Sequence, residues 1–502
     1  MRLDDAIKSF EASERRLAAL RRAQSVLGFD GMTCAPKNSA GGRAQTLGAL
    51  SRAAHGELLS NARFEAASAV AEHGEGVDEA LLLKARDALR EREKLLKKDR
   101  ALLAEYSVLT GEAFAAWREA KKRSDFSLLC PYLERVVDCA RRTAFAFSRE
   151  GDPVDYWLNE NEEGLKSARL DEWLALVRGG LEPLLRGISS RPVPDTGIIH
   201  GHFPKYLQQK FTDGLLRLMG VDRDRCAVGE AEHPYTTVID PDDVRITTHY
   251  YEDNVAANMF SVLHEGGHAI YGMGIDRSLA GSALGFAASA GMNESQSRLY
   301  ENMIGRTPAF AEAVLPLLRG IFPERFSGAE PGELFRAVCA VRPTLKRTEA
   351  DEVTCSLHIM VRHELEKKLL RGELEVRRLP EEWNRLYGEY LGIEVPSDRE
   401  GVLQDMHWPS GLFGYFPTYF LGNAYAAQIR AALKRDMDPD ERIRSGSVTE
   451  ITEWLRTHIH RFGRTKTPEE LIRSCCGGGF DPRVYVDYLN EKYGALYGLQ
   501  GF

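Results

Sequence analysis

The sequence of 502 residues predicts a mainly α-helical fold with one small β-sheet. Apolar residues recur at helical spacing through the first 150 residues, more helical segments follow residue 253, and only a short stretch at 235–250 favours strands. No internal repeat, low-complexity stretch or long linker divides the chain. We therefore expect a single domain over residues 1–502, with the sheet beside a functional site.

The first 150 residues are predicted to form helices. From residue 77 to residue 110 there is no Gly or Pro, and leucines recur every seven residues at 82, 89, 96 and 103. This pattern predicts one long helix that packs on its neighbours, with a free-standing coiled coil as the alternative. At the start of the chain, one helical face is marked by apolar residues three, four or seven apart: Leu3, Ile7, Phe10, Leu17, Leu20 and Leu27.

Strand-forming residues gather in one place. Residues 235–239 are rich in β-formers, the Asp-Pro-Asp-Asp sequence at 240–243 is a turn signal, and residues 244–250 alternate Val, Ile or Thr with Arg, Thr or His. We expect a small hairpin here. Further helices are expected at roughly 253–272, 292–305 and 344–371, and several more in the last hundred residues.

Charge and composition exclude several classes of protein. The formal net charge of −8 and the pI near 6.0 give no basic surface for nucleic acid. No run of about 18 apolar residues offers a membrane span, and the charged N-terminus lacks the apolar centre of a secretory signal. The eight cysteines lack metal-finger spacing, so reduced thiols in a cytoplasmic protein are expected.

The strongest motif is His264-Glu265-Gly266-Gly267-His268. Two histidines four residues apart lie on one face of a helix, where both imidazoles can bind one ion. Zn²⁺ lowers the pKa of a coordinated water to about 7, and Glu265 is placed to take its proton. A chance match on a buried helix is the alternative. Each glycine costs about 1 kcal/mol inside a helix, which fits a site where a substrate or a crossing helix must come close.

A catalytic zinc site needs a third protein ligand. Glu294 follows His268 by 26 residues, in the next predicted helix. Glu301 lies seven residues further on the same face and competes for this role, and either glutamate can instead be a solvated helix carboxylate. We expect one Zn²⁺ per subunit, with Co²⁺ as a possible substitute.

Several further segments carry a resemblance to a known family. They are His233-Pro234-Tyr235, Asp-Val-Arg-Ile-Thr at 243–247, the double-histidine helix, Asn293-Glu294-Ser295-Gln296, and Gly-Val-Leu-Gln-Asp-Met-His-Trp at 401–408. Together and in this order they resemble the thermostable carboxypeptidase (carboxypeptidase Taq) family of zinc metallocarboxypeptidases. Similarity also extends to residues 29–43, 347–351, 414–419 and 485–497, and so covers essentially the whole chain.

The resemblance implies a fold and an activity. The implied fold is a neurolysin-like divided cylinder, one domain with two lobes flanking a deep groove, and usually a homodimer. The implied reaction removes single residues from the C-termini of peptides, with broad specificity but poor release beside proline. The family's ligand glutamate corresponds to Glu294.

One departure lies beside the implied metal ligands. The family commonly has His-Glu-Ser-Gln where this chain has Asn293-Glu294-Ser295-Gln296. An amide still forms hydrogen bonds, but it carries no proton or charge near neutral pH. Tyr235 also stands where Phe is usual, and Phe29 where Trp is usual; both are conservative.

Catalytic roles follow from general-base hydrolysis. Glu265 is expected to take a proton from water and deliver it to the leaving amine. The tetrahedral intermediate needs a hydrogen-bond donor for its oxyanion. His407 and a tyrosine, Tyr419 first and Tyr415 second, are the candidates, although a lone tyrosine is as easily a core residue.

Substrate binding requires a cation for the terminal carboxylate, and a guanidinium suits it. Arg347 is the candidate that the resemblance favours and Arg245 is the other; a structural ion pair is the commoner fate of an arginine. Tyr415 is also expected to contact the substrate. The strand at 244–248 is expected to offer its edge to an extended peptide. His233 and Asp405 are expected to orient ligands or catalytic groups.

Two other functions remain open at this point. An oligopeptidase or dipeptidyl carboxypeptidase of similar helical build would share the zinc site but cut elsewhere. Asn293 raises the second possibility, a helical binding protein without activity, although the intact His264, Glu265, His268 and Glu294 argue against it.

Overall fold

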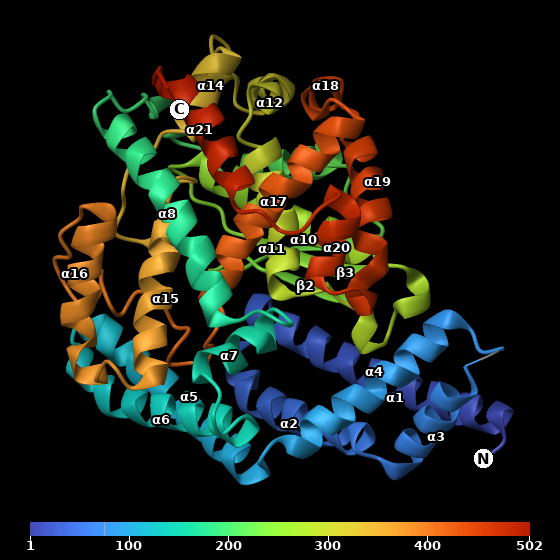
Figure 1. Ribbon diagram of the computed structural model, residues 1–502. Helices are drawn as coiled ribbons and strands as arrows, with labels where there is room; N and C mark the ends of the chain where they lie inside the picture. Colours follow the sequence, from blue (N-terminus) through green and yellow to red (C-terminus); the bar gives the residue numbers. More distant parts are fainter. Residues whose placement is uncertain (75, 502) are drawn as a thin grey trace.

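The computed structural model describes residues 1–74 and 76–501 and confirms the mainly helical fold (Figure 1). Within these residues the strands are β1 Cys226–Glu230, β2 Thr236–Asp240 and β3 Asp243–Thr248. The helices are α1 Leu3–Thr33, α2 Ala40–Leu58, α3 Asn61–His73, α4 Glu79–Lys97, α5 Arg100–Arg123, α6 Cys130–Phe147, α7 Pro153–Asn161, α8 Ser167–Ser189, α9 Lys205–Leu218, α10 Val255–Gly274, α11 Ala290–Arg298, α12 Pro308–Ile321, α13 Pro323–Phe326, α14 Pro331–Val338, α15 Cys355–Arg371, α16 Leu379–Leu391, α17 Phe416–Asp436, α18 Pro439–Arg444, α19 Val448–His458, α20 Pro468–Cys476 and α21 Arg483–Tyr497. None of the helices in the described residues is long and apolar enough to cross a membrane.

Helices α10, α11 and α17 form the centre of the molecule (Figure 1). Helix α11 lies between α10 and α17, and α10 also packs on α9 and on strands β2 and β3. Helix α15 packs against α17 from the other side. The helices that carry the double-histidine motif and the following glutamates are therefore enclosed by neighbours on several sides.

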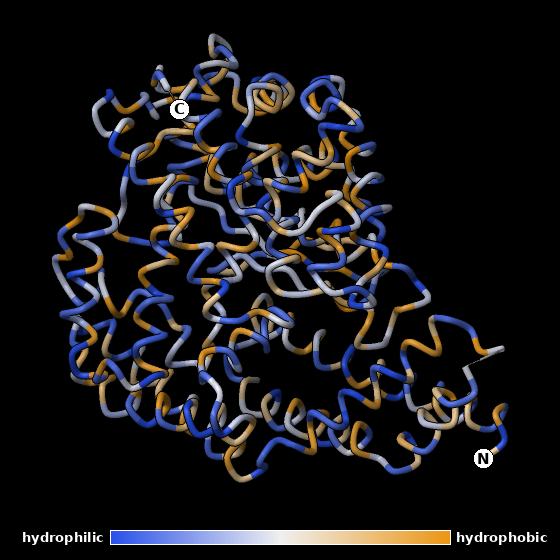
Figure 2. The backbone as a smooth tube through the Cα atoms, in the orientation of Figure 1, coloured by the Kyte–Doolittle hydropathy of each residue, from blue (hydrophilic) through white to orange (hydrophobic). Residues whose placement is uncertain are grey.

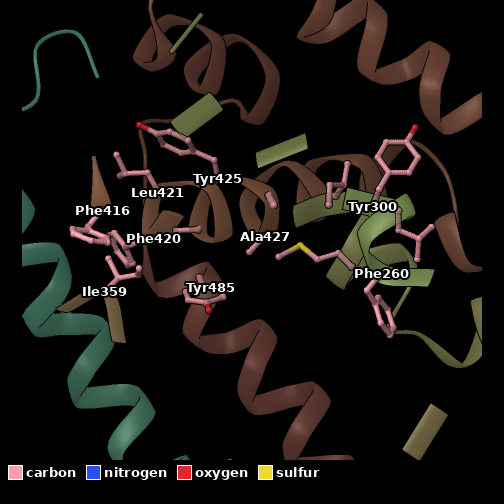
Figure 3. Close-up of a cluster of buried hydrophobic side chains, with 14 of the residues drawn as sticks. Phe260, Tyr300, Ile359, Phe416, Phe420, Leu421, Tyr425, Ala427 and Tyr485 are labelled. Carbon is pink, nitrogen blue, oxygen red and sulfur yellow. The ribbon is translucent and has the colours of Figure 1, made fainter. Parts of the chain in front are cut away.

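The main hydrophobic core is built around α17 (Figure 3). Phe416, Phe420 and Tyr425 of this helix pack with Ile359 of α15 and Tyr485 of α21. All five side chains are buried. Burying an apolar side chain of this size contributes roughly 1.5–3 kcal/mol, so this cluster fixes α15 and α17 against each other.

The N-terminal helices have a second, smaller core of their own. It joins α1, α3 and α4 and does not merge with the main core. Along these helices hydrophilic and hydrophobic residues alternate, as expected for helices with one buried face (Figure 2). The buried members of this N-terminal cluster are Ala6, Phe10, Ala66, Ala67, Val70, Ala85 and Ala88.

The leucine repeat of residues 77–110 does not form one helix. The helix breaks at Lys98 and Asp99, where the Asp99 side chain accepts hydrogen bonds from the backbone N–H groups of Ala101 and Leu102 in the first turn of α5. Leu96 and Leu103 are 55% and 37% exposed. The expectation of a single long helix, and with it the coiled-coil alternative, was wrong because an N-cap aspartate starts a new helix inside the repeat.

The predicted hairpin is present but belongs to a larger sheet. Strands β2 and β3 pair antiparallel, and β1 adds to the other edge of β3 in parallel, so that the order is β1-β3-β2 within the described residues. Strand β3 is therefore central and both of its edges are paired. The expectation that residues 244–248 offer a free edge to a peptide was wrong.

Two of the three predicted helices after the sheet have different bounds. The helix expected at 253–272 is present as α10, but α11 ends at Arg298 and a π-helical turn, Leu299–Ile304, follows. Helix α15 begins only at Cys355, and Arg347 lies in the short 3₁₀ turn Arg347–Glu349 before it. Arg347 therefore approaches the centre of the molecule from a loop and not from a helix.

Candidate metal centre

Side-chain caps fix the starts of the two helices that form the centre. Asn254 accepts hydrogen bonds from the backbone N–H groups of Ala256 and Ala257 at the start of α10. Ser289 accepts one from Met292 at the start of α11. Such caps are worth about 1 kcal/mol each. They set where each helix begins and, through the helical repeat, which residues face the partner helix.

His264, His268 and Glu294 come together between α10 and α11. Each offers one ligand atom, and these three atoms lie within 4.8 Å of one another. The Nε2 atoms of His264 and His268 lie 3.8 and 3.6 Å from the Glu294 Oε2. Two imidazole nitrogens and a carboxylate oxygen at this spacing can hold one metal ion.

Glu301 lies behind His264, on the side of the imidazole ring that faces away from Glu294. Its Oε2 is 2.8 Å from the other ring nitrogen of His264, Nδ1, which leaves Nε2 facing Glu294. Arg298 donates to Glu294 at 2.8 Å and to Glu301 at 2.9 Å. Glu301 lies in the π-helical turn, a geometry that is common at functional sites. One arginine thus holds both carboxylates beside His264.

Glycines allow α11 to approach its two neighbours closely. A Cβ on Gly267 would lie 2.6 Å from the Gln296 carbonyl oxygen, so the α11 backbone occupies that space. On the other side of α11, a Cβ on Gly422 of α17 would lie 2.7 Å from the Cβ of Glu294. Gly266 faces the Met219 side chain instead. The glycine pair of the motif thus serves a crossing helix at Gly267 and a packed side chain at Gly266.

Glu265 is buried beside the cluster and is held by the sheet. The Thr236 hydroxyl of β2 donates to its Oε2 at 2.6 Å. Burial raises the pKa of Glu265, whereas His264 and the Thr236 hydrogen bond oppose that rise. The carboxylate is 5% exposed. This environment brings the pKa of a glutamate nearer to neutral pH, which is what a general base requires.

The two histidines differ in their electrostatic surroundings. Burial lowers the pKa of His268 to about 4, so that its imidazole is neutral and free to act as a ligand. Burial also acts on His264, but Glu294 and Glu301 outweigh it and raise the pKa of His264 to about 9. Asn293 is near enough to His268 to favour its protonated form. The His268 Nδ1 nevertheless makes no hydrogen bond with the described residues.

His407, Tyr415 and Tyr419 form an aromatic group near the cluster. The His407 Nε2 lies 3.4 Å from the Tyr419 hydroxyl, and the two tyrosine rings pack edge to face. Burial raises the pKa of both tyrosines, and Glu294 raises it further. Burial lowers the pKa of His407 to about 4. The group thus offers protonated hydroxyls and a neutral imidazole near the Glu294 carboxylate.

Arg347 is joined to this group through Asp405. Both its Nε and its Nη2 lie 3.1 Å from the Asp405 Oδ1, and its guanidinium lies over the Tyr419 ring at 4.7 Å. The other Asp405 oxygen accepts from Arg362 at 2.6 Å. After the opposing effect of burial, the two arginines keep the pKa of Asp405 far below its usual range. Two cations share one carboxylate here, which leaves a net positive charge.

Arg245 and His233 are not joined to the cluster. Arg245 forms a bidentate pair with Asp243 of its own strand, at 2.9 and 3.1 Å, and stacks over Phe29. His233 is exposed in the segment before β2 and forms no hydrogen bond with the described residues. The structure thus gives Arg245 the structural ion pair that competed with the substrate-binding role, and it gives His233 no ligand to orient.

Comparison with known proteins identifies the family. A family model described as carboxypeptidase Taq (M32) metallopeptidase matches residues 9–493. The chain belongs to this family. It is therefore a metallocarboxypeptidase, an enzyme that hydrolyses peptides with a divalent metal ion. The resemblance that the ordered motifs predicted is confirmed.

Relatives and solved structures agree with this assignment over nearly the whole chain. Carboxypeptidase 1 of Bacillus subtilis is 35% identical over 98% of both chains. Thermostable carboxypeptidase 1 of Thermus thermophilus is 37% identical over 97% of this chain and 98% of its own. The M32 carboxypeptidase of Deinococcus radiodurans superposes with a TM-score of 0.94 at 34% identity, covering 98% of this chain and 100% of its own.

Three polar residues of the centre were not predicted from the sequence. Arg298 lies four residues after Glu294 on α11, so helical spacing alone offered a signal for it. Thr236 and Arg362 gave no such signal, because each reaches its partner from a different element of the fold. Contacts of that kind depend on how helices and strands pack.

Proposed function

We propose that this metallocarboxypeptidase uses zinc to remove single C-terminal residues from peptides, with broad specificity and poor release beside proline. The observation that carries the proposal is the set of three ligand atoms from His264, His268 and Glu294 within 4.8 Å, with the Glu265 carboxylate next to them. The assignment to the carboxypeptidase Taq family supports the exopeptidase reaction.

The donor set fits zinc. Two histidine nitrogens and one glutamate oxygen are a ligand set of catalytic zinc sites, which leave a further position open. His268 is neutral and His264 has its other ring nitrogen on a carboxylate, an arrangement that orients a metal-binding imidazole. When bound, the ion would lower the pKa of water and polarise the scissile carbonyl. Cobalt is a possible substitute in the same donor set.

Proton transfer is assigned to Glu265. Its carboxylate takes a proton from the attacking water and then delivers it to the leaving amine. Thr236 holds one carboxylate oxygen at 2.6 Å, which leaves the other oxygen free for this exchange. Because the group is 5% exposed, bulk water competes little for the transferred proton.

The remaining roles follow from the groups around Glu294. Tyr419 and His407, with Tyr415 as the second tyrosine, are proposed to donate to the oxyanion of the tetrahedral intermediate. Arg347 is proposed to bind the terminal carboxylate, in preference to Arg245, because the pair of arginines on Asp405 carries excess positive charge.

The residues proposed to orient others are Asp405, Asn293 and His233. Asp405 fixes Arg347, and its Oδ1 lies 3.8 Å from the His407 Nδ1. Asn293 stands beside His268 at the position where the family commonly has histidine. His233 is proposed for this role from the family resemblance, and its side chain is exposed with no hydrogen-bond partner among the described residues.

A peptide-ladder assay tests the reaction. Mass spectrometry of a digested peptide should show products shortened one residue at a time from the C-terminus, and a chelator should stop the reaction. Internal or dipeptide cuts would instead support an oligopeptidase or a dipeptidyl carboxypeptidase of similar fold.

A variant of the proposed base tests the mechanism. Glu265→Gln should bind stoichiometric zinc, measured by elemental analysis, yet lose at least about 10²-fold in kcat, the lower end of the usual range for a general base. A native protein without stoichiometric metal, or a variant as active as the native protein, would favour a binding protein over an enzyme.

The cytoplasmic location and the homodimeric state of the enzyme are also proposals. All eight cysteines are free in the described residues, which supports a reducing cytoplasm. A homodimer is proposed from the family resemblance, and sedimentation equilibrium tests it directly.

A further inference from the structure

A buried glutamate outside the metal cluster holds the loop that carries the proposed oxyanion donors. This loop, residues 401–415, is the last part of the connection between α16 and α17 and contains neither a helix nor a strand. Most of its residues are buried all the same. His407 and Tyr415 lie on it, and Tyr419 follows in the first turn of α17. The position of these side chains therefore depends on contacts that the loop makes with other elements.

Glu366 of α15 grips the loop at two places. Its Oε2 accepts the indole N–H of Trp408 at 2.7 Å, and its Oε1 accepts the backbone N–H of Gly414 at 2.6 Å. The carboxylate is fully buried. No lysine or arginine of the described residues forms an ion pair with it. One side chain thus ties together two points that are six residues apart in the loop.

A carboxylate in this position is costly. Burial raises the pKa of Glu366 to about 7, and the two N–H donors reduce that rise. Removing a charge from water without a cation partner is strongly unfavourable. An apolar side chain would fill the space without this cost, but only a carboxylate presents one acceptor oxygen to each of two donors. The unfavourable burial of this carboxylate is therefore explained by its two hydrogen bonds, one to Trp408 and one to Gly414.

The same helix holds the preceding part of the loop. Arg362, one turn before Glu366, donates to Asp405 at 2.6 Å and to Gln404 at 3.2 Å. His407 thus lies between two anchors on a single helix face. Its ring packs on Phe416 with the centroids 4.4 Å apart, so a shift of the loop would move the imidazole directly.

Gly414 occupies a position of the loop where a side chain does not fit. It has φ +68, and a Cβ there would overlap the backbone of Trp157. The chain is pressed against α7 at this point, and Glu366 holds it from α15. Tyr415 is the next residue. Because the Gly414 N–H is held by Glu366, the position of the Tyr415 backbone is constrained as well.

From these contacts we propose that Glu366 is a positioning residue for the hydrolytic reaction, which places His407 and Tyr415 by holding Trp408 and Gly414. The inference rests on the proposed roles of His407 and Tyr415 as oxyanion donors. The metal ligands come from α10 and α11, and Arg347 is held by Asp405, so Glu366 contacts neither the metal cluster nor the cation proposed for the substrate carboxylate.

The test compares Glu366→Gln with Glu364→Gln in the holoenzyme. Glutamine keeps the size but has one acceptor oxygen, so either Trp408 or Gly414 loses its partner. We expect kcat to fall about 10–100-fold, the effect of a displacement near 1 Å, with KM changed less than about 3-fold. Glu364 lies on the same helix but bonds Tyr390 and Lys368, and its variant should retain native kcat.

Zinc content and the melting temperature complete the comparison. Glu366→Gln should retain one zinc ion, because the ligands lie on other helices. A folded, zinc-loaded Glu366→Gln variant with native kcat would overturn the proposal, and so would a lowered melting temperature without a change in kcat. If the native enzyme itself gives no peptide ladder, it is the proposed function that fails.

Trp408→Phe provides a second route if Glu366→Gln does not fold. It removes one donor and keeps an aromatic ring, so kcat should fall in the same way. Where both variants fold, the double variant should be no slower than the slower single variant, because both changes release the same loop. Independent, multiplying losses would contradict a shared action through the loop, and native kcat in Trp408→Phe would contradict the role of the anchor.

Discussion

Gly422 lies directly against Glu294. A Cβ on Gly422 would lie 2.7 Å from the Glu294 Cβ, closer than real side-chain contacts allow. Glu294 is buried and has no free space on the side of α11 that faces α17. The absence of a side chain on α17 thus determines where a proposed metal ligand on α11 can stand.

Gly422→Ala is expected to weaken metal binding. The added methyl group must push Glu294 away from His264 and His268, and overpacking of this kind costs about 1–3 kcal/mol. Zinc affinity, measured by competition with a chelator, should fall about 10-fold or more. Gly388→Ala is the matched control, because Gly388 is exposed in α16 with no atom near its Cβ position. That variant should keep native affinity.

Glu301→Gln is expected to weaken zinc binding by a different route. The change removes the negative charge beside the His264 Nδ1 and reduces the basicity of the imidazole. Loss of a partner behind a metal ligand typically costs 10–100-fold in affinity. Chelator competition should show a loss in that range. An equal loss in Glu312→Gln, a change at an exposed glutamate of α12, would argue for a nonspecific charge effect.

Thr236→Val is expected to shift the pH profile of hydrolysis. The Thr236 hydroxyl favours the ionised form of Glu265, so its loss should raise the pKa of that carboxylate further. The acid limb of kcat/KM should then move to higher pH, with zinc content unchanged. Thr237→Val, the neighbouring change on the opposite face of β2, should leave the limb in place. An unmoved limb in Thr236→Val would argue against Glu265 as the base.

Glu162→Gln is expected to alter how stability depends on pH. Burial raises the pKa of Glu162 from its ordinary 4.5 to about 7, although Ser289, Tyr425 and the Gly291 N–H oppose it. Between pH 4.5 and 7 the folded state binds more protons at this carboxyl than the unfolded state. Its contribution is therefore fully present below pH 4.5 and is lost as the pH rises through 7.

Urea unfolding at several pH values measures this contribution. A shift from 4.5 to about 7 corresponds to about 3 kcal/mol. The native free energy of unfolding minus that of Glu162→Gln should fall by roughly this amount between pH 4.5 and pH 8. The buried histidines are common to both proteins and cancel in the difference. A constant difference across this range would contradict the prediction.

The parts of the site that could be predicted from sequence are those within one element. His264 and His268 share a helical face, and Glu265 adjoins them, so spacing alone brought these residues together. Glu294 and Glu301 could not be separated by spacing. The structure separates their roles, because the π-helical turn and Arg298 place Glu301 at the Nδ1 of His264, whereas Glu294 faces the Nε2.

The predictions of helices and strands were wrong where one or a few residues interrupt or depart from a longer sequence pattern. Asp99 interrupts a leucine repeat that otherwise extends across it. Strand β1 has the sequence Cys-Ala-Val-Gly-Glu, which lacks the alternation of a strand, and its pairing with β3 closed an edge that was expected to be free. Arg347 was placed in a helix because residues 344–354 carry no strong break, whereas the chain there forms a 3₁₀ turn and loop.

The separate core of the N-terminal helices affects how the molecule opens. Its seven buried side chains include five alanines and only one aromatic ring, so this cluster buries far less apolar surface than the main core. Amide hydrogens in α1, α3 and α4 should therefore exchange with solvent through a local opening of lower free energy than global unfolding. Helices α10 and α11, which carry the proposed metal ligands, belong to the main core and can keep their structure during that opening.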